Sequence, residues 1–294
     1  EILIGLVGSE MCIRDRLDMR RCFRTEQRHK DASVDIAASR TLLRNAMKQS
    51  KARIFIGQGF IGGAPDGTTT TLGREGSDYS AAVAANILDA ESMSVWKDVD
   101  GILNADPKVF PDAVQIAELN YLDTIELAYS GAQIIHPKTI KPLQNKNIPL
   151  YVRPFGDKRK PGTVIRRMSA PIEVPILILK KDQVLLTIRS RDFSFVLEEK
   201  FAAIFSLLER HRIKVNLVHN SAVNLSLCVD NSWHIDEAIQ ALRNEEFDVM
   251  KVENMELLTI RGYNGDLMER YASGPEVFLL QRTQSTARIV RKNR

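Results

Sequence analysis

Two different periods of apolar and polar residues follow one another along the first half of the chain. Apolar residues at helical spacing cover residues 35–50, and a short apolar run follows at residues 52–56. The first pattern is typical of a helix buried on one side, and the second of a strand. The succession then repeats, which predicts an α/β arrangement. The further predicted elements are an alanine-rich helix over 78–89, a helix over 124–132, and strands over 92–95 and 148–152.

The pattern changes after the loop-rich stretch RPFGDKRKPGT, residues 153–163, which indicates a domain boundary. Beyond it the periods predict the order βαββαβ, followed by a second and shorter round. A strand over 174–179 is available to complete the second round, which would interleave the two units. The first round has strands over 184–188, 213–218, 223–229 and 248–252 and helices over 198–210 and 234–243. The second has strands over 256–260, 276–281 and 286–290 and a helix over 266–271.

Composition narrows the class of protein. The chain has 294 residues, of which 44% are hydrophobic and 27% charged, with a formal net charge of +4, and this suits a soluble globular protein of about two domains. No apolar run approaches the roughly 18 residues of a membrane span. The three cysteines, Cys12, Cys22 and Cys228, are too scattered for a disulfide framework, so we expect a reducing compartment, the cytoplasm. Basic residues cluster near both ends of the chain without a nucleic-acid motif, and we interpret them as solvated surface.

The first sixteen residues, EILIGLVGSEMCIRDR, stand apart from the rest. They begin without a methionine and resemble translated adaptor sequence, so we exclude residues 1–16 from the expected fold as a non-native leader. Native sequence is then expected from about Leu17. The alternative is that residues 2–7 form a genuine strand, because a short apolar run fits a strand equally well.

The stretch TTTTLGREGSDYS, residues 68–80, is rich in hydroxyl groups and glycines before the alanine-rich helix. Glycines let backbone N–H groups approach a ligand, threonine hydroxyls add donors, and a helix N-terminus favours an anion. We therefore expect a phosphate or carboxylate here, with Arg74 able to hold a carboxylate through two hydrogen bonds and Ser77 or Asp78 capping the helix. The alternative is a threonine-rich β-hairpin in front of a capped helix.

The preceding stretch GQGFIG, residues 57–62, matches the dinucleotide-binding pattern GxGxxG after a strand. That pattern requires a helix to begin at once, whereas Gly63, Pro65 and Gly67 extend a loop. A nicotinamide site is therefore a distant alternative.

A second group of polar residues lies in VWKDVDGILNADPKVFPDA, residues 95–113. Asp98, Asp100 and Asp106 follow a strand, where α/β proteins usually bind ligands. These carboxylates are suited to orienting magnesium or a nucleotide, and Lys97 and Lys108 to balancing phosphate charge. A solvated loop with Asx-turns is the alternative.

A third stretch, SGAQIIHPKTIKPL, covers residues 130–143. A helix ends here and the chain turns at Pro137. We interpret His136 as a structural turn residue.

Taken in order, four blocks of the sequence resemble the aspartate kinase family of the amino-acid kinase superfamily, and the two βαββ-type units resemble its paired ACT regulatory domains. The implied fold is α/β: the C-terminal half of an amino-acid kinase α/β/α sandwich over 17–168, then two α+β ferredoxin-like ACT domains over 172–294. The family uses magnesium and ATP to phosphorylate the side-chain carboxylate of L-aspartate, which gives 4-phospho-L-aspartate on the way to lysine, threonine and methionine. The blocks are LDMRRCFRT, FIGQGFIGGAPDGTTTTLGREGSDYSAA, WKDVDGILNADPKVFPDA and GAQIIHPKTIKPL.

The resemblance also implies roles for individual residues. Those that bind aspartate and organise the site are Phe60, Arg74, Ser77 and Asp78, with Arg74 and Asp78 as the catalytic pair. Those that hold the nucleotide are Lys97, Asp98, Leu103, Lys108 and Gln133. Those that bind an inhibitory amino acid, at an interface between two copies joined through their ACT domains, are Ser190, Asp192, Phe193, Val215, Asn216, Asn220 and Ser221.

Several positions depart from the family pattern. The family begins with Lys-Phe-Gly-Gly-Thr-Ser, whose lysine stabilises the transferring phosphoryl group, and has a glutamate that holds the substrate ammonium; neither is found before Leu17. We therefore expect that about half of the kinase domain is missing and that this chain alone has no measurable kinase activity. Glu75 stands where glycine is common, and Leu103 and Gln133 replace a tyrosine and a lysine.

The identity of the effector stays open. Lysine-sensitive members carry a glutamate where Ala222 stands, so lysine, threonine, another amino acid or no effector remain possible. A non-catalytic regulatory protein that binds an amino acid through the ACT pair is the alternative function.

Overall fold

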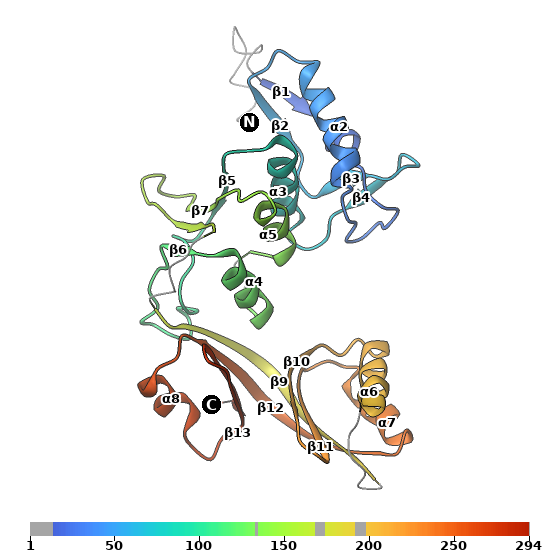
Figure 1. Cartoon of the computed structure of the whole chain (residues 1–294), viewed down its shortest axis with the longest axis vertical. Coiled ribbons are helices and arrows are strands. Elements are labelled where there is room, and N and C mark those ends of the chain that lie inside the picture. The colour runs from blue at the N-terminus through green and yellow to red at the C-terminus, as the bar shows by residue number, and fades with distance from the viewer. Residues whose placement is uncertain (1–13, 133–134, 168–173, 192–197, 294) are drawn as a thin grey trace. The chain divides into compact units, whose positions relative to one another are not determined.

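The computed structural model describes residues 14–132, 135–167, 174–191 and 198–293. The chain divides into two compact units, which are considered separately below. The first comprises Glu1–Ile102 and Gln115–Pro171, and the second comprises Leu103–Val114 and Ile172–Arg294. Figure 1 labels most of the helices and strands of both.

The first unit alternates strands and helices as the sequence predicts, so the expected α/β class is confirmed. Its largest sheet has four strands in the order β5-β7-β8-β6, with β5 and β7 parallel. The pairs β1–β2, parallel, and β3–β4, antiparallel, form two further small sheets. The helices are α1 (Met19–Cys22), α2 (Ile36–Lys48), α3 (Gly76–Leu88), α4 (Tyr121–Ser130) and α5 (Pro137–Gln144). The strands are β1 (Arg14–Leu17), β2 (Ile54–Gly57), β3 (Ile61–Gly63), β4 (Thr69–Thr71), β5 (Met93–Lys97), β6 (Glu118–Leu119), β7 (Leu150–Pro154) and β8 (Thr163–Ile165).

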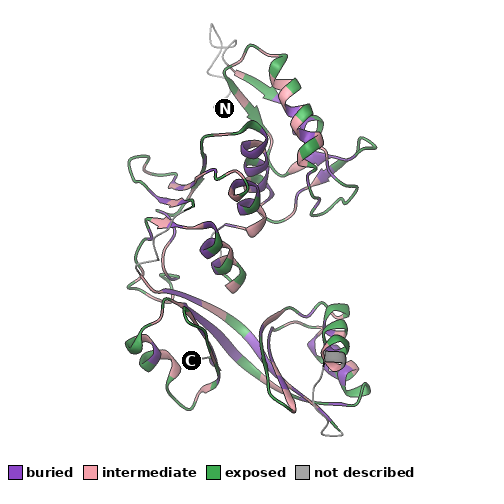
Figure 2. Cartoon of the chain, in the orientation of Figure 1, coloured by how far each residue is buried: buried purple, intermediate pink, exposed green. Residues whose placement is uncertain are grey.

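Helix α3 is the central buried helix of the first unit. Its small alanine side chains allow close packing, and Val83 and Ile87 are fully buried with Leu72 and Phe23 in one apolar cluster. Figure 2 shows the buried residues along this helix in purple. A helix buried on most sides fixes its first turn firmly, and the candidate site lies there.

Three residues of the excluded leader have a defined place in this fold. Arg14, Asp15 and Arg16 form strand β1 with Leu17 and pair in parallel with Ile54–Gly57. Residues 2–7, the alternative strand, lie outside the described residues.

The second unit is built on one six-stranded antiparallel sheet with helices packed on it. The strand order is β10-β11-β9-β12-β14-β13, and the α+β character agrees with two ferredoxin-like units that share the sheet. Its strands are β9 (Ile176–Ser190), β10 (Val215–Asn220), β11 (Asn224–Asp230), β12 (Phe247–Arg261), β13 (Val277–Arg282) and β14 (Thr286–Lys292). Its helices are α6 (Glu198–Arg210), α7 (Ile235–Asn244) and α8 (Gly265–Ala272).

The structure joins strands that the sequence pattern separates. The predicted strands over 174–179 and 184–188 are one strand, β9, and those over 248–252 and 256–260 are one strand, β12. The polar residues between them suggest turns, but each strand only bends there. Asp182 and Asn254 take positive φ angles of 55° and 59°, and the register shifts after Val252 before pairing resumes. The two long strands therefore run through both halves of the sheet.

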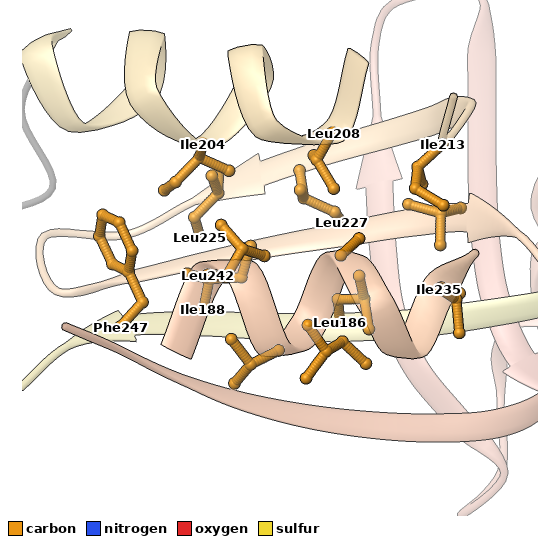
Figure 3. Packing of buried hydrophobic residues seen from close by; sticks show 14 of the residues in the cluster. Leu186, Ile188, Ile204, Leu208, Ile213, Leu225, Leu227, Ile235, Leu242 and Phe247 are labelled. Carbon is orange, nitrogen blue, oxygen red and sulfur yellow. The ribbon is translucent and has the colours of Figure 1, made fainter. Parts of the chain in front are cut away.

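Helices α6 and α7 cover the half of the sheet that contains β10 and β11. Figure 3 shows Ile204 and Leu208 of α6 above Leu225 and Leu227 of the sheet. Ile235 and Leu242 of α7 belong to the same cluster, and Figure 3 shows Leu186 and Ile188 of β9 beside them. Alternation along each strand supplies these side chains, as the sequence predicts.

Residues 103–114 leave the first unit and join the core of the second. Ala105 is buried there, and Phe110 packs edge-on against Tyr271 with ring centroids 6.2 Å apart. We call residues 103–114 the excursion. Asn104 anchors it, because its side-chain amide donates to the backbone carbonyl of Pro175 and its backbone carbonyl accepts from the N–H of Leu177, each at 2.8 Å. The predicted kinase domain, residues 17–168, contains residues 103–114, whereas the structure groups these residues with the second unit.

Within the described ranges of the chain, every helix is too short or too polar to cross a membrane.

Candidate functional site

The candidate site is organised around the first turn of α3. Glu75 precedes this helix in a left-handed conformation, with φ 53° and ψ 30°, and the helix begins at Gly76. The prediction that Ser77 or Asp78 caps the helix is therefore wrong, because both lie inside its first turn. The start is shifted by a tight turn in which the N–H of Gly76 donates to the carbonyl of Gly73 at 3.0 Å.

The loop after β2 packs directly on this first turn. A side chain at Gly59 would place its Cβ 2.9 Å from Cβ of Ser77, and one at Gly76 would lie 2.6 Å from the ring of Phe60. Phe60 has a positive φ of 73°, and its N–H donates to the hydroxyl of Ser80 at 2.9 Å. Phe60 and Ser77 are thus brought together because two glycines leave no side chain between the loop and the helix.

The glycine pattern of residues 57–62 does not open a helix. Strand β3 follows at Ile61 and pairs with β4. This geometry differs from a dinucleotide-binding turn.

Arg74 and Ser77 present their side chains to solvent at the start of α3. In the described part of the chain, no hydrogen bond or ion pair engages the guanidinium of Arg74. Its donors are consequently available to a ligand.

Asp78 is paired with the nucleotide-binding block. Its carboxylate lies 3.2 Å from Nζ of Lys97, and about a quarter of each side chain is exposed. Lys97 ends strand β5, while Asp78 lies in the first turn of α3. A predicted aspartate-site residue and a predicted nucleotide residue are therefore in contact.

The threonines before α3 have a structural role instead of the predicted one. Three of the four hydroxyls are hydrogen-bonded within the protein, and Thr69–Thr71 form strand β4, which makes a hairpin with β3. The expectation that these hydroxyls face a ligand is wrong, and the hairpin alternative describes this part of the stretch. The bonds join Thr68 to Asp66 at 2.7 Å, Thr70 to Thr25 at 2.7 Å, and Thr71 to the carbonyl of His29 at 2.9 Å.

The predicted nucleotide residues are divided between the two units. Lys97 and Asp98 belong to the first, where Asp98 is exposed after β5. Leu103 and Lys108 belong to the excursion in the second unit, and Lys108 is exposed. Gln133 lies outside the described residues.

The other carboxylates of this block have partners within the protein. Asp100 forms an ion pair with Lys160 at 2.5 Å. The carboxylate of Asp106 accepts the backbone N–H of Lys108 at 2.9 Å, which is the Asx-turn that the alternative interpretation proposes.

The described residues contain no group of three or more His, Cys, Asp or Glu side chains that could hold a metal ion. A magnesium ion that arrives with a nucleotide needs only one or two protein carboxylates, because phosphate oxygens and water complete its shell. Asp98 fits that requirement, and Lys97 fits a phosphate, although its ammonium is also shared with Asp78.

Those predicted effector residues that the structure describes do not form one cluster. Ser190 is buried and its hydroxyl accepts from Lys200 at 2.7 Å, whereas Asn220 and Ser221 are exposed at the end of β10. Val215 packs against the cluster under α6 and α7. Asp192 and Phe193 lie outside the described residues.

Asn216 belongs to a polar network inside the second unit. Its side-chain amide donates to Gln183 and to Asp230, each at 2.7 Å, and its carbonyl oxygen accepts from Lys180 at 2.8 Å. Burial alone would raise the pKa of Asp230, but hydrogen bonds from Lys180, Gln183 and Asn216 lower it. The amide of Asn216 is thus already engaged.

Two residues near the site have contacts that sequence reasoning missed. The carboxylate of Glu75 accepts the backbone N–H of His136 at 2.8 Å, and Nζ of Lys138 lies 2.8 Å from Asp31. His136 caps α5, since its Nδ1 accepts the N–H of Lys138 at 3.2 Å, in agreement with its interpretation as a turn residue. The only sequence feature that pointed to these contacts was Glu75 itself, which stands where glycine is common in the family.

The fold is that of a phosphotransferase family. The family model for the amino acid kinase family matches residues 5–154, and the chain belongs to that family. Within it the chain is similar to aspartate kinases. Lysine-sensitive aspartokinase 3 of Escherichia coli is 35% identical over 270 residues, which cover 89% of this chain and 60% of that protein.

Two solved structures of Escherichia coli aspartokinase III support the same assignment. The complex with aspartate and ADP (R-state) has a TM-score of 0.76 at 29% identity and covers 95% of this chain and 66% of that one. The complex with lysine and aspartate (T-state) has a TM-score of 0.73 at 30% identity and covers 94% and 65%. The chain therefore spans about three fifths to two thirds of the aspartokinase it matches.

Proposed function

We propose that this chain supplies the aspartate-binding side of a kinase that transfers the γ-phosphate of ATP to the side-chain carboxylate of L-aspartate. The observation that carries the proposal is the ion pair between Lys97 and Asp78, 3.2 Å long. It joins the carboxyl end of β5 to the first turn of α3, and a carboxylate and a phosphate are expected at these two positions. The similarity to an aspartokinase solved with aspartate and ADP agrees with this assignment.

In this proposal Arg74 binds a substrate carboxylate with two parallel hydrogen bonds. Its guanidinium is exposed, and no residue that the structure describes forms a hydrogen bond or ion pair with it. The fork of N–H donors on a guanidinium matches the two oxygens of a carboxylate better than the single ammonium of a lysine does. Ser77 and the first N–H groups of α3 add donors. Phe60, 41% exposed, forms an apolar wall beside them.

Lys97 serves the nucleotide side. Phosphoryl transfer depends on positioning and on neutralising charge, and bound ATP with magnesium supplies the phosphoryl group and a further cation. Asp78 holds the ammonium of Lys97 in place, and Asp98 is available as a carboxylate toward magnesium. Leu103, Lys108 and Gln133 complete the proposed set of nucleotide residues.

The second unit is proposed to regulate the enzyme through an amino-acid effector and to form a homodimer. Strand β10 is an edge of the sheet, and its Val218 is 39% exposed, so a second copy can extend the sheet there. Of the proposed effector residues, Val215, Asn216 and Asn220 lie in this strand, Ser221 follows it, and Ser190 ends β9. Asp192 and Phe193, which lie outside the described residues, complete the proposed set.

The enzyme is proposed to act in the cytoplasm. Cys22 and Cys228 are unpaired and buried, and burial raises the pKa of the Cys228 thiol to about 12. Such protonated thiols suit a reducing compartment.

The proposal is tested by titrating the purified 294-residue chain with L-aspartate and, separately, with MgADP, followed by NMR. We expect aspartate to shift signals around the first turn of α3, and Arg74→Ala to weaken that binding at least ten-fold while MgADP binding is retained. Arg53→Ala, which removes another exposed arginine of the first unit, is the matched control. Shifts confined to the second unit would instead support the regulatory protein, and no aspartate binding would contradict the proposal.

Turnover is measured in parallel with MgATP and hydroxylamine, which traps aspartyl phosphate. The sequence contains no Lys-Phe-Gly-Gly-Thr-Ser stretch, so we expect no product from this chain alone. Robust product formation would disprove that expectation and support the kinase assignment.

A further inference from the structure

The turn that carries Arg74 is held at both ends by the start of α5. On one side, Nζ of Lys138 donates to the carbonyl of Leu72 at 3.2 Å. On the other, the carboxylate of Glu75 accepts the backbone N–H of His136 at 2.8 Å. Arg74 therefore lies between two residues that are bound to the same helix end, and we call these two contacts the α5 clamp.

Glu75 takes part in the clamp at a position where a side chain is disfavoured. Its φ of 53° lies in the left-handed region, which glycine adopts more easily than any other residue. Although it occupies the N-cap position of α3, its side chain makes no capping hydrogen bond. The carboxylate is directed to α5 instead, so the side chain has a use that glycine could not supply.

Lys138 connects two further parts of the first unit. Its ammonium lies 2.8 Å from Oδ1 of Asp31, 3.4 Å from the carbonyl of Ala32, and 5.0 Å from the centre of the Tyr79 ring on α3. Only 22% of the side chain is exposed. One partly buried cation thereby ties α5 to α3 and to the loop that packs against Gly73.

The clamp leaves the side chain of Arg74 free. The turn itself is closed by the N–H of Gly76, which donates to the carbonyl of Gly73 at 3.0 Å, while the guanidinium is exposed. A rigid backbone that presents a free guanidinium needs little ordering when a carboxylate binds.

We propose that Glu75 and Lys138 are positioning residues that hold the turn around Arg74 in the conformation that binds aspartate. This inference rests on the proposed function, because it concerns the same substrate. Neither side chain touches the substrate; both act through the backbone on either side of Arg74.

The test compares aspartate and MgADP affinities in variants of the complete chain. We expect Lys138→Met and Glu75→Ala to weaken aspartate binding about ten-fold and to leave MgADP binding within two-fold, since each removes a charge-assisted hydrogen bond on the aspartate side only. The conservative variants Lys138→Arg and Glu75→Gln, which keep a cation and an acceptor, should restore most of the affinity. Lys141→Met, on the exposed side of the same helix, is the matched control.

A second readout does not depend on substrate. Amide exchange at Gly76 should accelerate at least five-fold in Lys138→Met and Glu75→Ala, because the turn opens more often, and should not change in Lys141→Met. The hydrogen bond from Lys138, with nearby Arg28 and His136, keeps the pKa of Asp31 below its ordinary value. That pKa should rise in Lys138→Met and stay low in Glu75→Ala.

The outcomes separate the inference from the proposed function. If the unsubstituted chain binds no aspartate, the proposed function fails, and unchanged exchange at Gly76 would independently reject the clamp. If it binds aspartate, and Lys138→Met and Glu75→Ala bind it as tightly as the unsubstituted chain does, the positioning role is wrong. Faster exchange at Gly76 without weaker aspartate binding would also overturn the positioning role, because the clamp would then be structural only.

Discussion

Lys97 at the end of β5 and Asp78 in the first turn of α3 form an ion pair 3.2 Å long. The two residues are predicted from different blocks of the sequence, one as a nucleotide residue and the other as an aspartate-site residue. Their contact brings the carboxyl end of a parallel strand to the N-terminus of a buried helix. Ligands of α/β proteins usually bind at the carboxyl ends of strands, and a helix N-terminus favours an anion. The ion pair therefore marks the candidate site.

A double-mutant cycle measures this pair directly. We expect Asp78→Asn and Lys97→Met to show a coupling free energy of about 0.5–1 kcal/mol in urea unfolding, because both side chains are about a quarter exposed and screened by water. Arg44→Met with Asp89→Asn, a more exposed pair in the same unit, is the control and should couple less strongly. A coupling of zero for the first pair would show that the contact does not hold Lys97 in place.

Gly73 offers a test of the turn that carries Arg74. Its φ is 80°, and a Cβ there would overlap the carboxylate of Asp31. Gly67 has a similar φ of 85° with open space around it. We expect Gly67→Ala to cost about 1 kcal/mol from backbone strain alone, and Gly73→Ala about 1–3 kcal/mol more, because the loop at Asp31 must also move. Urea unfolding of the two variants checks this, and equal costs would contradict the close approach of Asp31.

Phe110 tests whether residues 103–114 belong to the second unit. We expect Phe110→Ala to destabilise that unit by about 2–3 kcal/mol, because the ring is partly buried against Tyr271, 6.2 Å away between centroids. Phe110→Leu, which keeps most of the apolar volume, should cost less. The measurement is amide exchange: faster exchange in β12 and β14, with β5 unchanged, is the expected result, and the reverse pattern would assign the excursion to the first unit.

The lowered pKa of Asp230 predicts how the stability of the second unit changes with pH. Burial opposes ionisation of Asp230, but hydrogen bonds from Lys180, Gln183 and Asn216 lower its pKa below the ordinary value of about 4. Since the folded pKa is depressed, the stabilisation is present above pH 4 and is lost as the pH falls through the lower folded value.

Unfolding free energies measured between pH 2.5 and pH 6 test this dependence. The unfolding free energy should fall less on acidification in Asp230→Asn than in the unsubstituted chain, by about 1 kcal/mol. The difference is modest because the carboxylate is partly exposed. Asp266→Asn, which replaces an exposed carboxylate on α8, is the control. An unchanged pH profile for Asp230→Asn would rule out the network as its source.

Much of the fold follows from local pattern. The alternation of α2, β2, α3, β5, α4 and β7, the change of architecture after residues 153–163 and the helix over 198–210 were predicted, because periods of 3.6 and 2 residues record which face of each element is buried. Helix α5, which begins at the expected turn at Pro137, and the short strands β6 and β8 were not predicted. The two long strands were not predicted as continuous. Polar residues around Asp182 and Asn254 interrupt the pattern, and only pairing between β9 and β12 shows that the strands pass through.

The candidate site divides in the same way. The residue types at Phe60, Arg74, Ser77, Asp78 and Lys97 were available from the sequence, since glycines, an arginine and a helix start suffice to suggest an anion site. Their sequence separation did not show that Lys97 reaches Asp78, that the threonine hydroxyls are hydrogen-bonded within the protein, or that Glu75 and Lys138 hold the turn from α5. A single sequence records each residue's own preferences, whereas contacts across 19 to 66 positions depend on how separate elements pack. The sequence alone therefore determined the family-type blocks and their chemistry, and the tertiary structure decided which of those groups remain free to bind a ligand.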